Sequence, residues 1–281
     1  MTVRESWVQT RYRLEAANVP DAGLEAEVLL RHALGIDRAE YFASLEQPMA
    51  VSEQGLADTL AERRAGGEPL AYILGRREFY GHEIGVGPGV LVPRQETELL
   101  VDAVLEFVAA HDLRRPLIAD AGTGSGAIAI AVAKALPGAT VFATDISPAA
   151  LKIAEANTLA LGVDGTVRLL PGDLLEPLAE PVDVVVSNPP YLATDELADL
   201  PGEVRREPET ALDGGRDGLD AISKLMRQAP ARMRRPGMLA VEIAPRQLGA
   251  VVSQAQALFP DALVTHRLDL AGLPRVVHVL Q

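Results

Sequence analysis

Candidate strands alternate with candidate helices from Thr97 to the end of the chain, and this alternation limits the fold more than any other feature. The apolar run Val182–Ser187 is typical of a strand, and Ser147-Pro148 places a capping residue before Pro at the first position of a helix. Strand–helix alternation of this length predicts an α/β domain with a mainly parallel sheet covered on both faces. The expected strands are 117–120, 140–145, 166–170, 182–187, 238–243, 264–268 and 276–280, and the expected helices are 98–110, 126–136, 148–161, 219–233 and 246–258.

The beginning of the chain follows a different pattern. Apolar positions in residues 3–74 recur at three- and four-residue spacing without any strand pattern, which predicts a small helical module. Asp21 and Ser52 are candidate N-terminal caps for two of its helices. Glycines interleaved with apolar residues in 78–93 then predict a hairpin or a short extended linker.

The charge balance restricts the partners of this chain. Its net charge is −13, and an acidic chain repels phosphate backbones, so free DNA or RNA is a poor default substrate. The absence of Cys removes thiolate chemistry and fits a reducing compartment, and the five His residues lack the spacing of a metal site. The charged start, without an apolar core, and the lack of a long apolar stretch predict a cytoplasmic protein that does not enter a membrane.

A glycine-rich loop, 120–126, lies between the first expected strand of the large domain and a helix. Such glycines let backbone N–H groups and a helix N-terminus approach a ligand closely. Asp145 ends the next expected strand, about 20 residues on, where a ribose-binding carboxylate is expected. No Lys-Ser/Thr pair follows the glycines, so the loop is not a P-loop, and the pattern predicts a nucleoside-containing cofactor while leaving a nicotinamide cofactor open.

A second loop, Asn188-Pro189-Pro190-Tyr191, follows the expected strand 182–187 directly. The two prolines stiffen it, and ligands of open α/β sheets bind beyond the carboxyl ends of the strands. The Asn188 side-chain oxygen and the Pro189 carbonyl are both acceptors, and together they can take the two N–H bonds of one planar NH₂ group. Tyr191 can stack on such a group and exclude water. The loop therefore predicts methyl transfer to an NH₂ group, without distinguishing an adenine amine from a glutamine amide.

Taken together, these motifs resemble the PrmC/HemK family of glutamine methyltransferases, which act on peptide chain release factors. The resemblance covers essentially the whole chain, and the segments that carry it are 69–75, 77–81, 91–94, 96–98, 120–126, 143–148, 186–191, 211–215 and 269–272. It implies a Rossmann-like, seven-stranded methyltransferase core whose last strand is antiparallel. It also implies an N-terminal helical domain (1–75) that docks the substrate, a β-hairpin linker (76–93) and a methyltransferase domain (94–281).

The resemblance also implies a cofactor, a partner and site residues. The cofactor is S-adenosyl-L-methionine, and the partner is a class 1 release factor, methylated at the Gln of its Gly-Gly-Gln motif. The implied cofactor-binding residues are Gly122, Thr123, Gly124, Ser125, Gly126, Asp145, Asp173, Leu174 and Asn188. The implied substrate-binding residues are Asn188, Pro189, Pro190 and Tyr191, of which Asn188, Pro189 and Tyr191 carry the catalysis.

This chain departs from the family pattern at two positions. Gln95 stands where the family usually has Pro, and Leu174 stands where it often has Trp, so aromatic stacking on adenine is lost. Asp173 remains available to bond the adenine amino group. A solvated loop is expected at 205–207. The rival activities are adenine methylation in nucleic acid, glutamine methylation in a ribosomal protein, and cofactor binding without catalysis.

Overall fold

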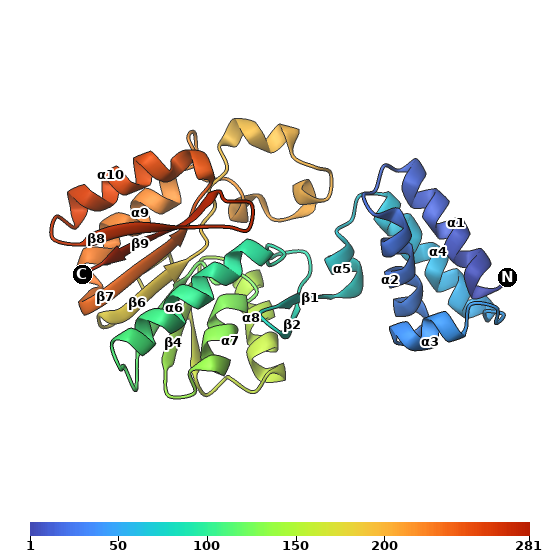
Figure 1. The fold of residues 1–281 in the computed structure, drawn as a ribbon, viewed down its shortest axis with the longest axis horizontal. Coiled ribbons are helices and arrows are strands. Elements are labelled where there is room, and N and C mark those ends of the chain that lie inside the picture. Colours follow the sequence, from blue (N-terminus) through green and yellow to red (C-terminus); the bar gives the residue numbers. More distant parts are fainter. The chain divides into compact units, whose positions relative to one another are not determined.

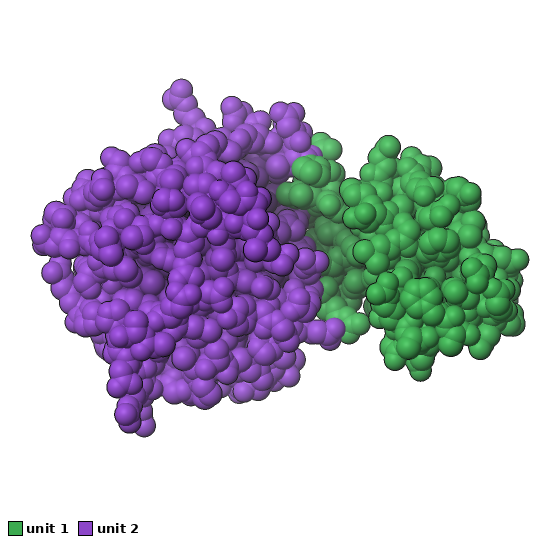
Figure 2. All heavy atoms as spheres, viewed as in Figure 1, with its two compact units in different colours: residues 1–76, 201–206 green, residues 77–200, 207–281 purple.

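The computed structural model describes residues 1–281, which divide into two compact units (Figure 2). The helical unit comprises residues 1–76 and 201–206, and the sheet unit comprises residues 77–200 and 207–281. The short segment 201–206 therefore belongs to the helical unit although the sequence on both sides of it belongs to the sheet unit. No helix in the structure is both long enough and apolar enough to cross a membrane.

The helical unit is built on a small apolar core. Its helices are α1 (Val3–Ala16), α2 (Ala22–Leu34), α3 (Arg38–Ala43), α4 (Val51–Ala65) and α5 (Leu70–Leu74). Leu14, Leu29 and Leu60 are buried together, and Trp7 packs against them while its indole N–H donates to the Gly23 carbonyl at 2.9 Å. These contacts confirm the helical module expected from the apolar spacing.

Of the two expected caps in this unit, Asp21 stands at the expected position without a capping bond, and Ser52 is wrong. Asp21 occupies the N-cap position of α2, but its φ of 51° is left-handed and its side chain makes no capping bond. Ser52 lies inside α4, whose N-cap is Ala50, and the free backbone N–H of Ala50 donates to the Glu53 carboxylate at 2.7 Å. A glutamate reaching back from the first turn thus replaces the expected serine cap.

Arg64 ties the segment 201–206 into the helical unit. Its side chain is only 4% exposed and pairs with Glu25 at 2.5 Å and with Glu203 at 2.7 Å. Arg206 adds a bond from its guanidinium to the Gly66 carbonyl. A buried guanidinium needs such partners, because an unpaired charge in this position would be strongly destabilising.

The sheet unit confirms the expected α/β architecture. Its seven-stranded sheet has the order β5-β4-β3-β6-β7-β9-β8, and β9 is antiparallel to both of its neighbours, β7 and β8. The strands are β3 (Leu117–Ala121), β4 (Thr140–Asp145), β5 (Val167–Pro171), β6 (Val182–Ser187), β7 (Met233–Glu242), β8 (Leu263–Leu268) and β9 (Pro274–Leu280). Before them, β1 (Arg76–Phe79) and β2 (His82–Gly85) form a separate hairpin.

Helices cover both faces of this sheet (Figure 1). One face carries α6 (Glu98–Ala110), α7 (Ala127–Ala135) and α8 (Pro148–Ala160), and the other carries α9 (Asp220–Gln228) and α10 (Leu248–Leu258). Short 3₁₀ turns occupy Gln95–Thr97, Thr194–Asp199, Val204–Arg206, Glu209–Ala211, Ala229–Ala231 and Pro245–Gln247. Of the seven strands in this sheet, β3 is the first in the sequence, and it lies between β4 and β6. The strands that follow β3 are therefore added first on one side of it (β4, β5) and then on the other (β6, β7). Ligands of open α/β sheets bind at the point where the strand order reverses in this way.

The expected helix 219–233 is too long. It ends at Gln228, gives way to a 3₁₀ turn and is followed by β7, which begins at Met233 rather than at residue 238. Pro230 explains the difference, because proline contributes no N–H to a helix and therefore interrupts its hydrogen bonds. The extra residues of β7 pair Met233 with Val182 at the start of β6.

Candidate active site

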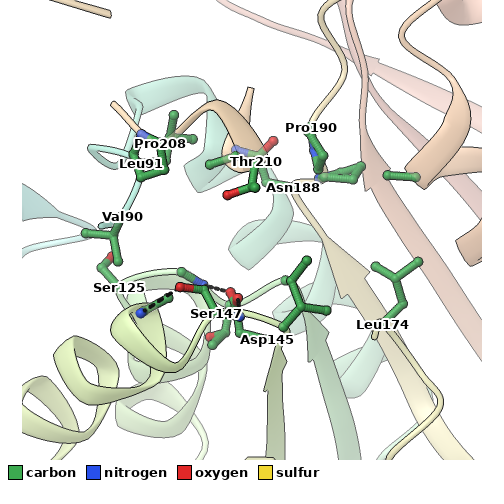
Figure 3. Close-up of a pocket in the computed structure, with 18 of the residues that line it drawn as sticks. Val90, Leu91, Ser125, Asp145, Ser147, Leu174, Asn188, Pro190, Pro208 and Thr210 are labelled. Carbon is green, nitrogen blue, oxygen red and sulfur yellow. Dashed lines mark hydrogen bonds between the residues drawn. The ribbon is translucent and has the colours of Figure 1, made fainter. Parts of the chain in front are cut away.

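One cavity of ≈ 330 Å³ lies at the carboxyl ends of β3, β4 and β6. The residues on its wall include Gly122, Thr123, Gly124, Ser125, Asp145, Asp173, Leu174, Asn188, Pro189 and Pro190, together with parts of the linker (Val90, Leu91, Pro93) and of a later loop (Pro208, Thr210, Ala211). Figure 3 shows Asn188, Pro190 and Thr210 facing Ser125, Asp145 and Ser147 across this space. Most of the residues singled out in the sequence are thus brought to one place.

The glycine loop needs glycine for its backbone conformation. Gly122, Gly124 and Gly126 have φ values of 76°, 56° and 83°, all in the left-handed region that other residues avoid. The space beside Gly122 and Gly124, where a Cβ would stand, is open, whereas a Cβ on Gly126 would lie 3.3 Å from the Ala154 side chain. Gly126 is the N-cap of α7 and does not lie on the cavity wall.

Asp145 is held in place by backbone N–H groups. Its Oδ2 accepts from the Gly124 N–H at 2.9 Å, and its Oδ1 accepts from the Ser147 N–H at 2.8 Å. Each carboxylate oxygen has a second lone pair, so both oxygens can still accept bonds from a ligand hydroxyl. The carboxylate is therefore rigid and oriented before any ligand arrives.

Asp120, which the sequence analysis did not single out, is buried beneath the glycine loop. Its Oδ2 accepts from the Thr123 hydroxyl at 2.6 Å and from the Ala129 N–H at 3.1 Å, whereas its Oδ1 has no partner. Burial, reinforced by the nearby charge of Asp145, raises the pKa of the Asp120 carboxyl to about 7. The position of an acid two residues before the first glycine of the loop was the available signal.

Leu174 and Asp173 form one side of the cavity. Leu174 adopts a left-handed φ of 52°, and its carbonyl accepts from the Thr144 hydroxyl at 2.7 Å, which fixes its apolar side chain on the wall. Asp173 pairs with the Lys224 ammonium at 2.5 Å, and Lys224 also lies on the wall. The sequence did not reveal this cation beside the expected adenine-binding carboxylate.

Asn188 lies opposite the glycine loop with one polar atom unsatisfied. Its Nδ2 donates to the Thr97 hydroxyl oxygen at 3.1 Å, whereas its Oδ1 is buried without any hydrogen-bond partner. Pro189 and Pro190 lie on the cavity wall beside it. Tyr191 does not: it is partly buried against the apolar core, and its hydroxyl lies 3.4 Å from Glu242 Oε1.

Glu242, the last residue of β7, is a buried carboxyl that the sequence analysis missed. It is 1% exposed, and its Oε2 accepts from the Thr97 hydroxyl at 2.7 Å. Burial raises its pKa to about 7, against the opposing positive charge of Arg275. An acid that ends an otherwise apolar strand was the only sequence signal, and it does not indicate which partner the acid meets.

Glu207 corrects the expected solvated loop. Its side chain is 5% exposed, and its carboxylate accepts from the Val92 N–H at 2.9 Å and from the Arg94 guanidinium at 2.5 Å. A charge that finds two donors can be buried, and the sequence could not show that Val92 of the linker and Arg94 just after it supply them. Glu207 thereby joins the linker to the loop that carries Pro208, and both contribute to the cavity wall.

Comparison with known proteins gives a consistent result over both parts of the chain. Residues 5–75 match the PrmC N-terminal domain, and residues 95–201 match the methyltransferase small domain. A release factor glutamine methyltransferase of Moorella thermoacetica is 46% identical over 259 residues, which cover 92% of this chain and 91% of that protein. The chain belongs to the release factor glutamine methyltransferase family. Another member, from Koribacter versatilis, is 39% identical over 281 residues and covers 99% of this chain and 98% of its own.

Solved structures show the same fold at lower identity. The hMettl16 catalytic domain in complex with an RNA hairpin superposes with a TM-score of 0.58 at 17% identity, covering 79% of this chain and 81% of that one. A 16S rRNA methyltransferase of T. thermophilus in complex with AdoMet and guanosine superposes with a TM-score of 0.53 at 20% identity, covering 73% and 49%. The sheet of this family member is therefore a Rossmann-like methyltransferase fold.

Proposed function

We propose that this protein transfers a methyl group from S-adenosyl-L-methionine to the side-chain amide nitrogen of the Gln in the Gly-Gly-Gln motif of class 1 peptide chain release factors. The observation that carries the proposal is the unpartnered, buried Oδ1 of Asn188, held at the end of β6 opposite the glycine loop. A buried acceptor without a donor is destabilising, so its retention here favours a ligand that supplies an N–H group.

The residues on the cavity wall suit S-adenosyl-L-methionine. The open space beside Gly122 and Gly124 leaves room for close approach, and Asp145 presents a carboxylate whose free lone pairs can accept both ribose hydroxyls. A cavity of ≈ 330 Å³ falls within the range of small-molecule sites. The residues we assign to the cofactor are Gly122, Thr123, Gly124, Ser125, Asp145, Asp173, Leu174 and Asn188. Gly126, which is not on the cavity wall, shapes the loop that presents them. When bound, this cofactor supplies a methyl group activated by a sulfonium.

The chain's own contribution to the chemistry is alignment. An amide nitrogen is a weak nucleophile, because its lone pair is delocalised into the carbonyl, so it must be held close to its target, at about 3–3.5 Å. Asn188 Oδ1 and the Pro189 carbonyl accept its two N–H bonds and so orient the nitrogen. We assign Pro190 to the pocket of the glutamine side chain, where the stiff Pro-Pro pair keeps both acceptors in place. Tyr191 does not lie on the cavity wall, so we assign it a supporting role beside Glu242.

We also assign a role to each part of the chain. Residues 1–75 dock the release factor, residues 76–93 form the β-hairpin linker, and residues 94–281 carry the methyl transfer. The match of residues 5–75 to the PrmC N-terminal domain supports the first assignment. The acidic net charge of −13 supports a protein rather than a nucleic acid as the partner.

The decisive experiment uses S-adenosyl-L-methionine labelled on its methyl group. The protein is incubated with a class 1 release factor and, in parallel, with the same factor carrying Gln→Ala in its Gly-Gly-Gln motif. Label on the first factor alone is the expected result. Label on both factors would reject the glutamine assignment, and label on an adenine-containing RNA but on neither factor would favour the rival activity.

A further inference from the structure

We propose that Thr97 and Glu242 are positioning residues that fix which end of the Asn188 amide faces the substrate. This inference rests on the proposed function, because it concerns the acceptor that receives the substrate N–H. An asparagine side chain is nearly symmetric in shape, but one end accepts hydrogen bonds and the other donates them. Rotation of the amide by half a turn would present a donor to the incoming NH₂ group.

The arrangement forms a chain of two hydrogen bonds. The Thr97 hydroxyl donates to Glu242 Oε2 at 2.7 Å, and the Asn188 Nδ2 donates to the Thr97 oxygen at 3.1 Å. Thr97 and Glu242 are both buried, so water does not compete for these bonds. Asn188 Oδ1 then remains as the unpartnered atom.

The single hydrogen of a hydroxyl group determines the direction of this chain. Because Thr97 gives its hydrogen to Glu242, it has only lone pairs to offer Asn188. The Asn188 amide must therefore turn its NH₂ group toward Thr97, and its oxygen is directed away, to the position where an acceptor is needed. The opposite orientation would place two lone pairs against each other and lose a buried hydrogen bond.

The backbone at Thr97 leaves its hydroxyl available for bonds outside its own helix. Thr97 ends the 3₁₀ turn Gln95–Thr97, which leads directly into α6, and its φ of −66° and ψ of −20° are helical. A side chain that caps a helix usually stands on a residue with an extended backbone, and Thr97 makes no capping bond. Its hydroxyl bonds Glu242 and Asn188 instead.

The groups around Glu242 determine whether it can act as an acceptor. Burial is the largest influence and favours its neutral form, whereas the hydrogen bond from Thr97 and the charge of Arg275 on β9 favour its ionised form. Glu96, in the 3₁₀ turn before α6, also opposes ionisation. The Tyr191 hydroxyl lies 3.4 Å from its second oxygen, Oε1, as a further donor. When Glu242 is ionised, it accepts from Thr97 and Tyr191 at its two oxygens.

The test compares Thr97→Val, which removes the hydroxyl at nearly constant shape, with Thr97→Ser, which keeps it. We expect Thr97→Val to lower kcat on the release factor about tenfold or more, and Thr97→Ser to stay within about threefold of the wild type. The dissociation constant for S-adenosyl-L-methionine, measured by calorimetry, should change less than about twofold in both variants. Full activity of Thr97→Val, or an equal loss in Thr97→Ser, would overturn the proposal.

A second variant covers the case in which Thr97→Val does not fold. Glu242→Gln is close in shape, but its side chain can either accept from or donate to Thr97, so it no longer imposes a direction. We expect kcat to fall at least about threefold at unchanged cofactor affinity, and an unchanged kcat would overturn the proposal. Failure of the wild-type protein to methylate the release factor would instead reject the proposed function, which separates the two outcomes.

Discussion

The two sides of the cavity are built in different ways. The cofactor-facing side consists of the glycine loop and Asp145, which are joined by a backbone N–H bond across only 21 residues of sequence. The amide-facing side consists of Asn188, Thr97 and Glu242, which are joined through side chains across 91 and 145 residues. One side is thus a local motif, and the other exists only once distant parts of the sheet unit have come together.

This difference predicts different failures. On the cofactor-facing side, backbone N–H groups already hold the Asp145 carboxylate in place. A change there should weaken the binding of S-adenosyl-L-methionine while leaving the rate of methyl transfer in the bound complex intact. The amide-facing side keeps one acceptor free for the substrate, so a change there should slow the reaction while leaving cofactor binding intact.

Asn188→Ala is the strongest test of the amide-facing side. We expect kcat on the release factor to fall by about 10²–10³, the usual loss when one preorganised hydrogen-bonding group is removed from a reacting centre. The dissociation constant for S-adenosyl-L-methionine should change less than about threefold, which steady-state kinetics and calorimetry can check together. Equal losses in both quantities would mean that Asn188 mainly holds the cofactor, and the contrast between the two sides would disappear.

Each side of the cavity also has one buried carboxyl with a raised pKa, Asp120 on the cofactor-facing side and Glu242 on the amide-facing side. The pKa values of Asp120 and Glu242 both rise to about 7, so the stability that each group contributes is fully present below its unfolded pKa and is lost as the pH rises through 7. As the pH rises from 5 to 8, the wild type should therefore lose free energy of unfolding that Asp120→Asn and Glu242→Gln do not lose. The difference between each variant and the wild type should shift in favour of the variant by up to about 3 kcal/mol over this range. Urea unfolding at several pH values measures this change.

The same experiment can contradict the comparison. If wild type and both variants show parallel stability curves across this pH range, neither carboxyl titrates where its burial predicts. If the pH dependence of the free energy of unfolding differs from wild type in only one variant, only one of the two carboxyls has a pKa raised by burial.

Asp145→Asn tests the cofactor-facing side. Neutralising this carboxylate weakens charge-assisted bonds to a ligand, so the dissociation constant for S-adenosyl-L-methionine should rise about 10- to 100-fold. At saturating cofactor, kcat should stay within about threefold of wild type. Asp164→Asn, a change at an exposed aspartate away from the cavity, is the matched control and should leave both quantities unchanged. A large loss of kcat in Asp145→Asn would remove the distinction between the two sides.

Gly126→Ala has the smallest expected effect and tests whether the glycine loop is a conformational requirement. Its φ of 83° disfavours any side chain, and the added Cβ would lie 3.3 Å from Ala154 and Ile130 side-chain atoms. We expect a loss of about 2 kcal/mol in the free energy of unfolding, measured with urea. Gly162→Ala is the control, with a similar φ of 65° but nothing within 4 Å, and should lose only about 1 kcal/mol. Equal losses would show that close packing at Gly126 is unimportant.

Sequence patterns predicted the parts of the fold that depend on neighbouring residues. The expected bounds of β4, β6 and α6 agree with the structure, because each carries an uninterrupted apolar pattern between clear turns. The start of β7 and the end of α9 were wrong, since the apolar pattern alone did not show where Pro230 interrupts the helix. The antiparallel last strand followed only from the family resemblance.

By itself, the sequence determined the glycine loop, the ribose-directed acid Asp145 and the stiff loop at Asn188, because each depends on a few adjacent residues and on which end of a strand they follow. The tertiary structure alone decided that Thr97 and Glu242 stand behind Asn188 and leave its oxygen without a partner. It also decided that Glu207 is buried against the linker. A hydrogen bond between residues 91 or 145 positions apart depends on which strands lie side by side in the sheet, and that order leaves no pattern in the local sequence.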